Sequence, residues 1–523
     1  MTDAPMHADL SRPRYGWSNR ILILVVAAIL FITLYPFSFD FSRHFARTLF
    51  PFSLDGWAKK SGWPDAFLNI LLFVPYGFAV AEKLRERGRS KLATLGWTFA
   101  AGALLSYGVE FLQIWNPWRD SGWEDVCTNS LGAALGAVLG NLCGGAVFRL
   151  LSQTGRQAGA WLSWQRAVLV FLLYIGIWSA IAVRLEKESR LSGWNSDAQL
   201  VIGNAASNPY SVVWQGRVFT LELWDHAVPA ALARRLTSQV PSDALASDSI
   251  VAYRFSGPVS VPDQRHLLPD LSWRPEAPTS ASPDSAFLDG KSWLMSEGAV
   301  PGLVSDLERT GQFSLWVLCE PAEIDDVDAQ IVSLSSLSGS ANMELRQDDA
   351  KLVFWFRTPL SLRRSRMSWT VPNAFAAKEV RNILLSFDGA KLRLFIDGKE
   401  TSGSYQLGAG AALARSVRRI KADELVGYQY IFCALVFFPT GCLVGFVWRT
   451  APKHWIGRLS LILGLILPAV LLEVTLVYEK GRSVSFENIW LSILLAVGGA
   501  LWMNVDRSSG QVRREQHEVQ SAR

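Results

Sequence analysis

The chain has 523 residues, of which half are hydrophobic and only 19% are charged. A soluble protein of this length would usually carry more charge, so the composition argues against a soluble protein. The net charge of +5 comes from short basic segments beside apolar runs, and it gives no nucleic-acid signal. Apolar runs of about 18–25 residues, long enough to cross a bilayer, occupy both ends of the chain.

Eight of these runs are predicted to span a membrane, and a polar stretch of roughly 240 residues follows the fifth. The first run is too long, and too weakly followed by a cleavage site, to be a signal peptide, so we expect an uncleaved anchor. The predicted spans are Ile21–Phe37, Ala66–Ala81, Leu92–Ile114, Val126–Phe148, Ala167–Val183, Gly427–Trp448, Ile456–Val477 and Ile489–Val505.

The positions of Lys and Arg predict the orientation of these spans. Basic residues precede the first span, follow the second, fourth and sixth, and fill the C-terminal tail. They all fall on one side if both termini are cytoplasmic, which places the polar stretch outside the cytoplasm. Basic residues in the first outer loop weaken this asymmetry without reversing it.

The cysteines and histidines suggest neither a disulfide framework nor a metal site. Four of the five cysteines lie in predicted spans, and Cys319 is alone in the polar stretch. The six histidines are scattered without metal-ligand spacing. We therefore expect no metal in the membrane part.

Polar residues gather near the outer ends of the second, third and fourth spans. Each of these spans carries two polar residues three or four positions apart, which places the two on one face of a helix. Taken singly, each residue is more simply a helix cap or polar glue between helices. As a set at one depth, they predict a ligand-binding pocket, with Arg119 as the counter-charge. The predicted pocket residues are Asp65, Asn69, Glu110, Gln113, Arg119, Asp125 and Asn129.

Glycine and proline mark two of the same spans. Gly132, Gly136, Gly140 and Gly144 follow one another at four-residue spacing and form a smooth stripe, which another helix can approach closely. Pro75 removes a backbone hydrogen bond from the second span.

The segments "NILLFVPYGF", "YGVEFLQ" and "PWRDSGWEDVCTNSLGAALG" resemble the VanZ-like family of bacterial membrane proteins over roughly residues 20–150. The resemblance implies a small polytopic module in the bacterial cytoplasmic (inner) membrane. The founding member of the family is associated with resistance to a glycopeptide antibiotic. The family has no established reaction, so the resemblance implies no chemistry.

The C-terminal spans repeat the pattern in a degenerate form. "LLFVPYG" corresponds to "LVFFPTG", and Glu110-x8-Arg119-x4-Glu124 corresponds to Glu473-x8-Arg482-x4-Glu487. Chance is a competing explanation, because apolar helices look alike. An internal duplication is the prediction, and it pairs Asn69 with Cys433, Gln113 with Leu476, Asp125 with Asn488 and Asn129 with Ser492.

The polar stretch reads as β structure. In "LLSFDGAKLRLFIDGKE", two Asp-Gly turns flank a strand of alternating residues, which is a hairpin signal. Several other short alternating strands favour a β-sandwich. The stretch resembles the laminin G-like, concanavalin A-like jelly roll in "FSLWVLCEP", "NMELRQDDAKLVFWFR" and "SFDGAKLRLFIDGKE". The segment "LVIGNAASNPYSVVWQGRVFTLELWDHAV", usually last in such domains, comes first here, which indicates a circular permutation.

Jelly rolls of this type often bind glycans or proteins. Asp325, Asp326 and Asp328 could hold a calcium ion, although a solvated acidic loop is the simpler interpretation. No other cofactor is expected.

The fold class predicted from these patterns is a polytopic α-helical membrane protein with an inserted all-β jelly-roll sandwich domain outside the cytoplasm. Residues 1–19 and 506–523 are predicted cytoplasmic tails that flank the folded parts. The predicted domains between them are 20–150 (VanZ-like), 164–184 (fifth span), 186–425 (β-sandwich) and 427–505 (second copy).

Three functions remain open on the sequence alone. The first is a protein that binds membrane lipids and an envelope glycan, lipid-linked glycan or glycopeptide. No nucleic-acid partner is expected, and the sequence does not give the oligomeric state. The second is an intramembrane enzyme in which Glu110 or Asp125 is a general base. The third is a membrane-anchored adhesion or scaffolding protein. Only the enzyme predicts that Glu110→Gln abolishes activity with normal membrane insertion.

Overall fold

A computed structural model places most of the chain in two compact units. It describes residues 17–35, 39, 63–116, 122–207, 213–238, 248–255, 260–278, 284–362, 367–401, 405–417, 425–452, 454–480 and 482–521. The first unit comprises Met1–Leu172, Thr440–Gly464 and Ala496–Arg523. The second comprises Leu173–Pro439 and Leu465–Leu495.

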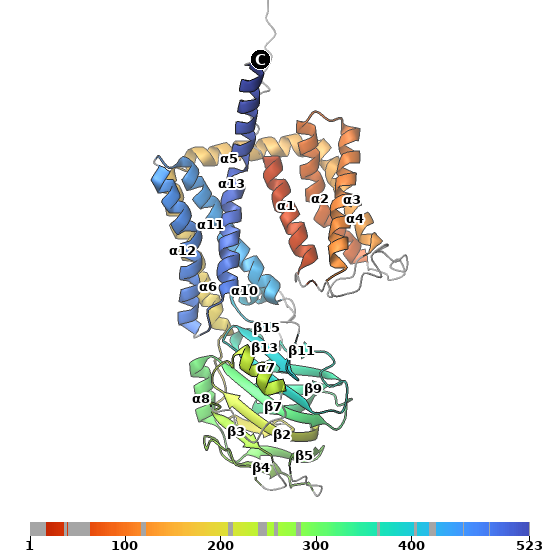
Figure 1. Cartoon of the computed structure of the whole chain (residues 1–523), viewed down its shortest axis with the longest axis vertical. Coiled ribbons are helices and arrows are strands. Elements are labelled where there is room, and N and C mark those ends of the chain that lie inside the picture. Colours follow the sequence, from red (N-terminus) through yellow and green to blue (C-terminus); the bar gives the residue numbers. More distant parts are fainter. Residues whose placement is uncertain are drawn as a thin grey trace, which may run out of the picture. The chain divides into compact units, whose positions relative to one another are not determined.

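Four helices of the first unit pack around one apolar core (Figure 1). They are α1 (Trp17–Leu34), α2 (Trp63–Glu86), α3 (Lys91–Gln113) and α4 (Trp123–Leu139). Phe73 and Tyr76 of α2 meet Val109 of α3 and Ala133 of α4 in this core. Ser90 begins α3 as its N-cap, accepting a hydrogen bond from the Ala93 backbone N–H at 3.3 Å.

The glycine stripe of α4 is the surface on which α2 packs. A Cβ atom added at Gly132 would lie 2.3 Å from the Ile70 carbonyl oxygen, and one at Gly136 would lie 2.1 Å from that of Val74. The contact is reciprocal, because a Cβ atom at Gly77 of α2 would lie 1.9 Å from the Ala133 carbonyl oxygen. Only glycine allows the two backbones to come this close.

The fourth predicted span is bent where the stripe ends. After α4 the chain forms a π-helix, η3 (Gly140–Gly144), and then α5 (Gly145–Trp161). The continuous stretch Trp123–Trp161 has 39 residues, about twice what a bilayer needs. Figure 1 shows α5 running across the direction of α1–α4. Val126–Phe148 is therefore not one straight span, because a π-helix inserts an extra residue and bends the helix.

An ion pair between the half-buried Arg85 and the buried Glu82 supports this bend. Arg85 donates to the Gly140 carbonyl oxygen at 3.0 Å and to Glu82 Oε2 at 3.0 Å. Glu82 is 1% exposed, and a Cβ atom at Gly144 would lie 2.9 Å from its Oε2 atom. The pair thus occupies space that glycine leaves, and Arg85 serves a carbonyl group of the π-helix.

Eight helices among the described residues are long and apolar enough to cross a membrane. The later ones are α6 (Trp164–Glu186), α11 (Leu425–Thr450), α12 (His454–Lys480) and α13 (Phe486–Ser521). The boundary between the two units falls inside these four helices. The weakest predicted span, Ala66–Ala81, lies inside the 24-residue helix α2. The prediction of several long apolar helices is confirmed.

Two antiparallel sheets of the second unit form a β-sandwich-like region, as predicted for the polar stretch. In the described residues, the seven-stranded sheet has the order β11 (Trp369–Val371), β10 (Lys351–Phe356), β9 (Ala341–Asp348), β8 (Ala329–Ser335), β1 (Gln199–Ile202), β6 (Trp293–Ser296) and β4 (Leu271–Arg274). The other sheet has the order β14 (Lys399–Glu400), β13 (Lys391–Ile396), β12 (Arg381–Phe387), β7 (Phe313–Pro321), β2 (Gln215–Trp224) and β3 (Val251–Arg254). β15 (Tyr405–Gln406) pairs with β13, and β5 (Ala286–Asp289) pairs with β2.

The core of this region lies between the two sheets. Phe313 of β7 and Phe387 of β12 contact Phe356 of β10, with ring centroids 5.4 and 4.9 Å apart. Helix α7 (Ala230–Ser238) packs its apolar side on the other face of β7 and β12. The predicted Asp-Gly turns are present, with Gly389 and Gly398 at φ +90° and +80°. The early strands β1 and β2 lie inside the two sheets, while the jelly-roll class stays a prediction.

Candidate functional site

One face of α3 is polar although the helix is apolar enough to cross a membrane. Ser106, Glu110 and Gln113 lie on this face because they follow one another by four and three residues. They are 0%, 2% and 6% exposed. Buried polar groups of this kind are costly unless they are hydrogen-bonded. Neighbouring elements supply a partner for each of them.

Helix α4 meets this face through the amide group of Asn129, and α2 meets α4 through the amide group of Asn69. Asn129 of α4 donates from Nδ2 to Ser106 Oγ at 2.9 Å. One turn nearer the start of α4, Asp125 Oδ1 accepts a hydrogen bond from Asn69 Nδ2 of α2 at 2.6 Å. The structure thus brings together two pairs of polar residues from three helices.

Glu110 is held against the beginning of α4. Its Oε2 atom accepts a hydrogen bond from the Gly122 backbone N–H at 2.9 Å. Gly122 is the N-cap residue of α4 and has no side chain to serve the free N–H groups there. A carboxylate at this place also interacts favourably with the positive end of the helix dipole. Glu110 therefore has a structural role besides any function.

Gln113 and Asn116 hold the end of α1. Gln113 donates from Nε2 to the Thr33 carbonyl oxygen at 2.8 Å, and Asn116 donates from Nδ2 to that of Leu34 at 3.2 Å. These carbonyl groups belong to the last turn of α1 and have no partner inside that helix. Within the part of the chain that the structure describes, two buried amide oxygens nearby have no hydrogen-bond partner, namely Gln113 Oε1 and Asn129 Oδ1.

The polar face of α3 ends at a tight helix contact on the side nearer the beginning of the helix. A Cβ atom at Gly102 would lie 2.5 Å from the Ala133 Cβ atom, so α3 and α4 are in tight contact one turn beyond Ser106. From Gln113 to Ser106, α3 rises by about 10 Å. We call the residues along this depth the α3–α4 cluster, and its members are Asn69, Ser106, Glu110, Gln113, Asp125 and Asn129.

Two residues of the predicted pocket are not among the members of this cluster. Asp65 is exposed on the first turn of α2, and Arg119 lies outside the described residues. Ser106 was missed by the prediction, although its position four residues before Glu110 on a helix could have identified it. Asn116 was missed as well; it lies beyond the last residue of α3, where helical spacing no longer predicts the direction of a side chain.

Two contacts of the first four helices recur in the C-terminal helices. Glu473 accepts a hydrogen bond from the Ser485 backbone N–H at 2.7 Å, and twelve residues separate these two, as they do Glu110 and Gly122. A Cβ atom at Gly441 would lie 1.8 Å from the Ala496 carbonyl oxygen, much as Gly77 meets Ala133. The duplication stays a prediction, which these recurring contacts favour.

Glu473, the C-terminal counterpart of Glu110, belongs to a buried ion pair. Arg482 is 4% exposed and donates two hydrogen bonds to Glu473, at 2.8 and 2.7 Å. Glu186 lies 3.3 Å from the same guanidinium group. Burial alone would lower the pKa of Arg482, but Glu186 and Glu473 raise it above its ordinary value, so the group stays charged.

A turn of the β-sandwich contacts the same loop. Ser483 donates from Oγ to Asp388 Oδ2 at 3.0 Å, and a Cβ atom at Gly389 would lie 2.9 Å from the Arg482 Cβ atom. Asp388 and Gly389 belong to the turn between β12 and β13. The residues that begin this loop, Arg482 and Ser483, are therefore packed against the turn between β12 and β13.

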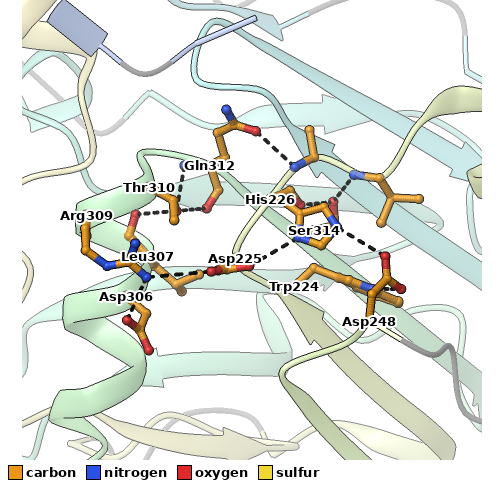
Figure 2. A network of polar contacts seen from close by, with 12 residues as sticks. Trp224, Asp225, His226, Asp248, Asp306, Leu307, Arg309, Thr310, Gln312 and Ser314 are labelled. Atoms are coloured by element: carbon orange, nitrogen blue, oxygen red, sulfur yellow. Dashed lines mark hydrogen bonds and ion pairs between the residues drawn. The ribbon is translucent and has the colours of Figure 1, made fainter.

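A second polar cluster lies on the β-sandwich and is drawn in Figure 2. His226 lies between two carboxylates, with Nδ1 at 3.2 Å from Asp225 and Nε2 at 3.4 Å from Asp248. The indole N–H of Trp224 donates to Asp248 at 3.1 Å, and Arg309 approaches Asp225 at 3.8 Å. These contacts join the end of β2 to α8 (Pro301–Thr310) and to residue 248, which indicates a structural network.

Asp248 of this network has a lowered pKa. Burial alone would raise the pKa of its carboxyl group, but the Trp224 N–H, its own backbone N–H and His226 lower it. Such a group stabilises the fold above its unfolded pKa, and this contribution is lost as the pH falls through its folded pKa. The free energy of unfolding, followed by tryptophan fluorescence, should therefore be plotted against pH for wild type and for Asp248→Asn, each relative to its own value at pH 7. As the pH falls, it should begin to decrease at a higher pH in wild type than in Asp248→Asn. The side chain is 49% exposed, so the shift should be small, and identical curves would contradict it.

The part of the chain that the structure describes contains no metal-binding arrangement of side chains. No group of three or more His, Cys, Asp or Glu residues there could hold a metal ion. In the predicted calcium loop, Asp326 accepts a hydrogen bond from the Gln215 backbone N–H at 3.3 Å, and Asp328 pairs with Arg346. Calcium binding stays a prediction.

Comparison with known proteins bears on the helical part. No curated protein and no solved structure matches the chain. A protein-family model described as VanZ/LLP1 matches residues 21–144. This range contains α2, α3, α4 and the whole α3–α4 cluster. Residues 21–144 are thus similar to the VanZ/LLP1 family, as the sequence motifs predicted.

Proposed function

We propose that this protein is a VanZ-like integral membrane protein of the bacterial cell envelope, which binds the polar part of an envelope ligand in the α3–α4 cluster. The ligand would be a glycan, a lipid-linked glycan or a glycopeptide. The match of residues 21–144 to the VanZ/LLP1 family supports an envelope-associated membrane protein.

One observation carries the binding role. Glu110, Gln113 and Asn129 are 2%, 6% and 3% exposed in helices that are apolar enough to cross a membrane. Polar and ionisable residues in such positions are rare and commonly mark a ligand or ion site. Their structural bonds leave two amide oxygens without a partner, so helix packing does not account for the whole cluster.

The β-sandwich would contribute a second binding surface. We propose that it is a laminin G-like jelly roll that holds a glycan or a protein on the outer side of the cytoplasmic membrane, with both chain termini in the cytoplasm. Membrane lipids would surround the helices. Arg119 would contact an anionic part of the ligand.

The first test is ligand binding by the purified full-length protein in detergent. Labelled envelope lipids and glycopeptides are offered to wild type, Arg119→Ala and Asp125→Asn. We expect Asp125→Asn to weaken binding by about tenfold, because a hydrogen bond to a charged group is lost. Cys127→Ser, two residues away on the exposed side of α4, should bind as wild type does. Equal binding by all variants would reject the cluster as a ligand site.

The runner-up is an intramembrane enzyme that acts on lipid-linked envelope glycans. The buried carboxylate of Glu110 favours it, since burial can prepare a carboxylate for general base chemistry. The same assay separates the two functions when the products are analysed. An enzyme requires that wild type converts the ligand and that Glu110→Gln binds it without conversion. Binding without any conversion by wild type supports the binding protein.

A further inference from the structure

We infer that the α3–α4 cluster receives a primary ammonium group, which donates hydrogen bonds and carries positive charge. This inference deepens the proposed function and rests on it. It names the chemistry of the ligand group at Gln113, Asn129 and Asp125.

The first argument is that the unsatisfied atoms of the cluster are hydrogen-bond acceptors. The Thr33 carbonyl oxygen can only accept, so the Gln113 amide must direct Nε2 toward it, which leaves Oε1 without a donor. Asn129 donates from Nδ2 to Ser106 Oγ, and its Oδ1 atom likewise accepts no hydrogen bond from the described residues. A buried acceptor without a donor is unfavourable, so a ligand that brings N–H groups would be favoured over one that brings oxygen atoms.

The second argument is the charge at this end of the helices. Asp65, Glu110, Glu124 and Asp125 lie there. In α2, α3, α4 and the turn after α2, as far as the structure describes them, every Lys and Arg lies between residues 83 and 91, at the opposite end. In the loop between α3 and α4, Arg119 and Asp120 together add no net charge. In the loop before α2, the basic residues Arg43, Arg47, Lys59 and Lys60 exceed the acidic residues Asp40 and Asp55 by two, so two of the four negative charges remain uncompensated. At the cluster itself, an anionic ligand group would therefore meet net negative charge, which opposes its binding and leaves any anionic part of the ligand to Arg119 in the loop.

The third argument is the match of donors to acceptors. A primary ammonium group offers three N–H donors and one positive charge. The cluster offers the carboxylate of Asp125, to which Asn69 supplies one hydrogen bond, and the free Asn129 Oδ1 one helical turn away on the same face of α4, so one ammonium group can address both. Gln113 Oε1 adds a further free acceptor on α3. A quaternary ammonium group would satisfy the charge and none of the acceptors. A hydroxyl group would satisfy one acceptor and no charge.

The predicted second copy supplies conservative variants. It carries Leu476 where the first has Gln113, Ser492 where the first has Asn129, and Asn488 where the first has Asp125. Gln113→Leu with Asn129→Ser removes both free oxygens by residues that the C-terminal helices already accommodate. Asp125→Asn removes the charge in the same way. Cys127→Ser is the control, because Cys127 lies on the exposed side of α4.

The test measures binding of three amphiphiles of equal chain length to the full-length protein in phosphatidylcholine nanodiscs. Octylammonium has charge and donors, octyltrimethylammonium has charge alone, and octanoate is an anion. Binding is followed by thermal stabilisation, with empty nanodiscs to correct for partitioning. We expect octylammonium to bind at least about tenfold more tightly than the other two. The double variant should lose this preference, and Cys127→Ser should keep it.

The outcomes separate this inference from the proposed function. Equal or tighter binding of octanoate or octyltrimethylammonium overturns the ammonium site and leaves a ligand pocket in place. Octylammonium binding that the double variant and Asp125→Asn both retain overturns it too. If no amphiphile and no envelope ligand binds, the proposed function fails with it. Should the double variant not fold, Asp125→Asn alone decides whether the preference depends on the cluster.

The source of the ammonium group can be read in the same experiment. Nanodiscs that contain phosphatidylethanolamine should weaken octylammonium binding if a lipid headgroup is the natural ligand. Free glucosamine should weaken it, and N-acetylglucosamine should not, if the ligand is an amino sugar. Either result supports the ammonium site.

Discussion

Replacing Arg482 with leucine is expected to destabilise the second unit by about 3–5 kcal/mol, because Glu473 would remain buried without its cation. Arg482 and Glu473 are each 4% exposed, and two hydrogen bonds join them. Glu186, 3.3 Å away, would add to the uncompensated charge. Thermal unfolding of the purified protein in detergent would show the loss as a lower midpoint, or as failure to fold.

A surface ion pair provides the matched control for Arg482. Lys187 lies 3.3 Å from Glu479, but its side chain is 52% exposed. Lys187→Ala should change the midpoint little, because solvent screens exposed pairs. Arg482→Lys should lie between the two, since an ammonium group cannot make the paired hydrogen bonds of a guanidinium group. If Arg482→Leu were no worse than Lys187→Ala, the buried pair would have no role in stability.

Adding one methyl group at Gly77 is expected to destabilise the first unit by about 1–3 kcal/mol or more, whereas the same change at Gly108 should not. At Gly77 the new Cβ atom would lie 1.9 Å from the Ala133 carbonyl oxygen, so α2 and α4 must separate. At Gly108 of α3, no atom lies within 4 Å of the new Cβ atom. Gly108→Ala should even stabilise the helix slightly, by up to about 1 kcal/mol.

Thermal unfolding of the two alanine variants in the same detergent tests this: the midpoint should fall for Gly77→Ala and stay equal or rise for Gly108→Ala. Gly441→Ala extends the test to the C-terminal helices, where the new Cβ atom would lie 1.8 Å from the Ala496 carbonyl oxygen. It should resemble Gly77→Ala if the two places are equivalent. Equal midpoints for Gly77→Ala and Gly108→Ala would show that the α2–α4 contact relaxes without cost.

The helices and the strands could be predicted from local patterns along the chain. Long apolar runs indicated the membrane helices, and the alternating residues between Asp388 and Asp397 indicated the hairpin of β12 and β13. Helical periodicity also placed Glu110 and Gln113 on one face of α3. Such patterns extend over a few residues, so they can be recognised without knowing which elements pack against them.

The partners of the polar side chains were decided by the tertiary structure alone. Gln113 serves the Thr33 carbonyl group 80 residues earlier, and Asn69 meets Asp125 across 56 residues. The bend at η3 was not evident either, because the apolar run continues through it. Which groups a helix face meets depends on how the helices pack, and similar apolar faces could pack in many ways. By itself, the sequence thus determined that Glu110 and Gln113 share a polar face of an apolar helix, and the packing of α1–α4 decided which groups each of them contacts.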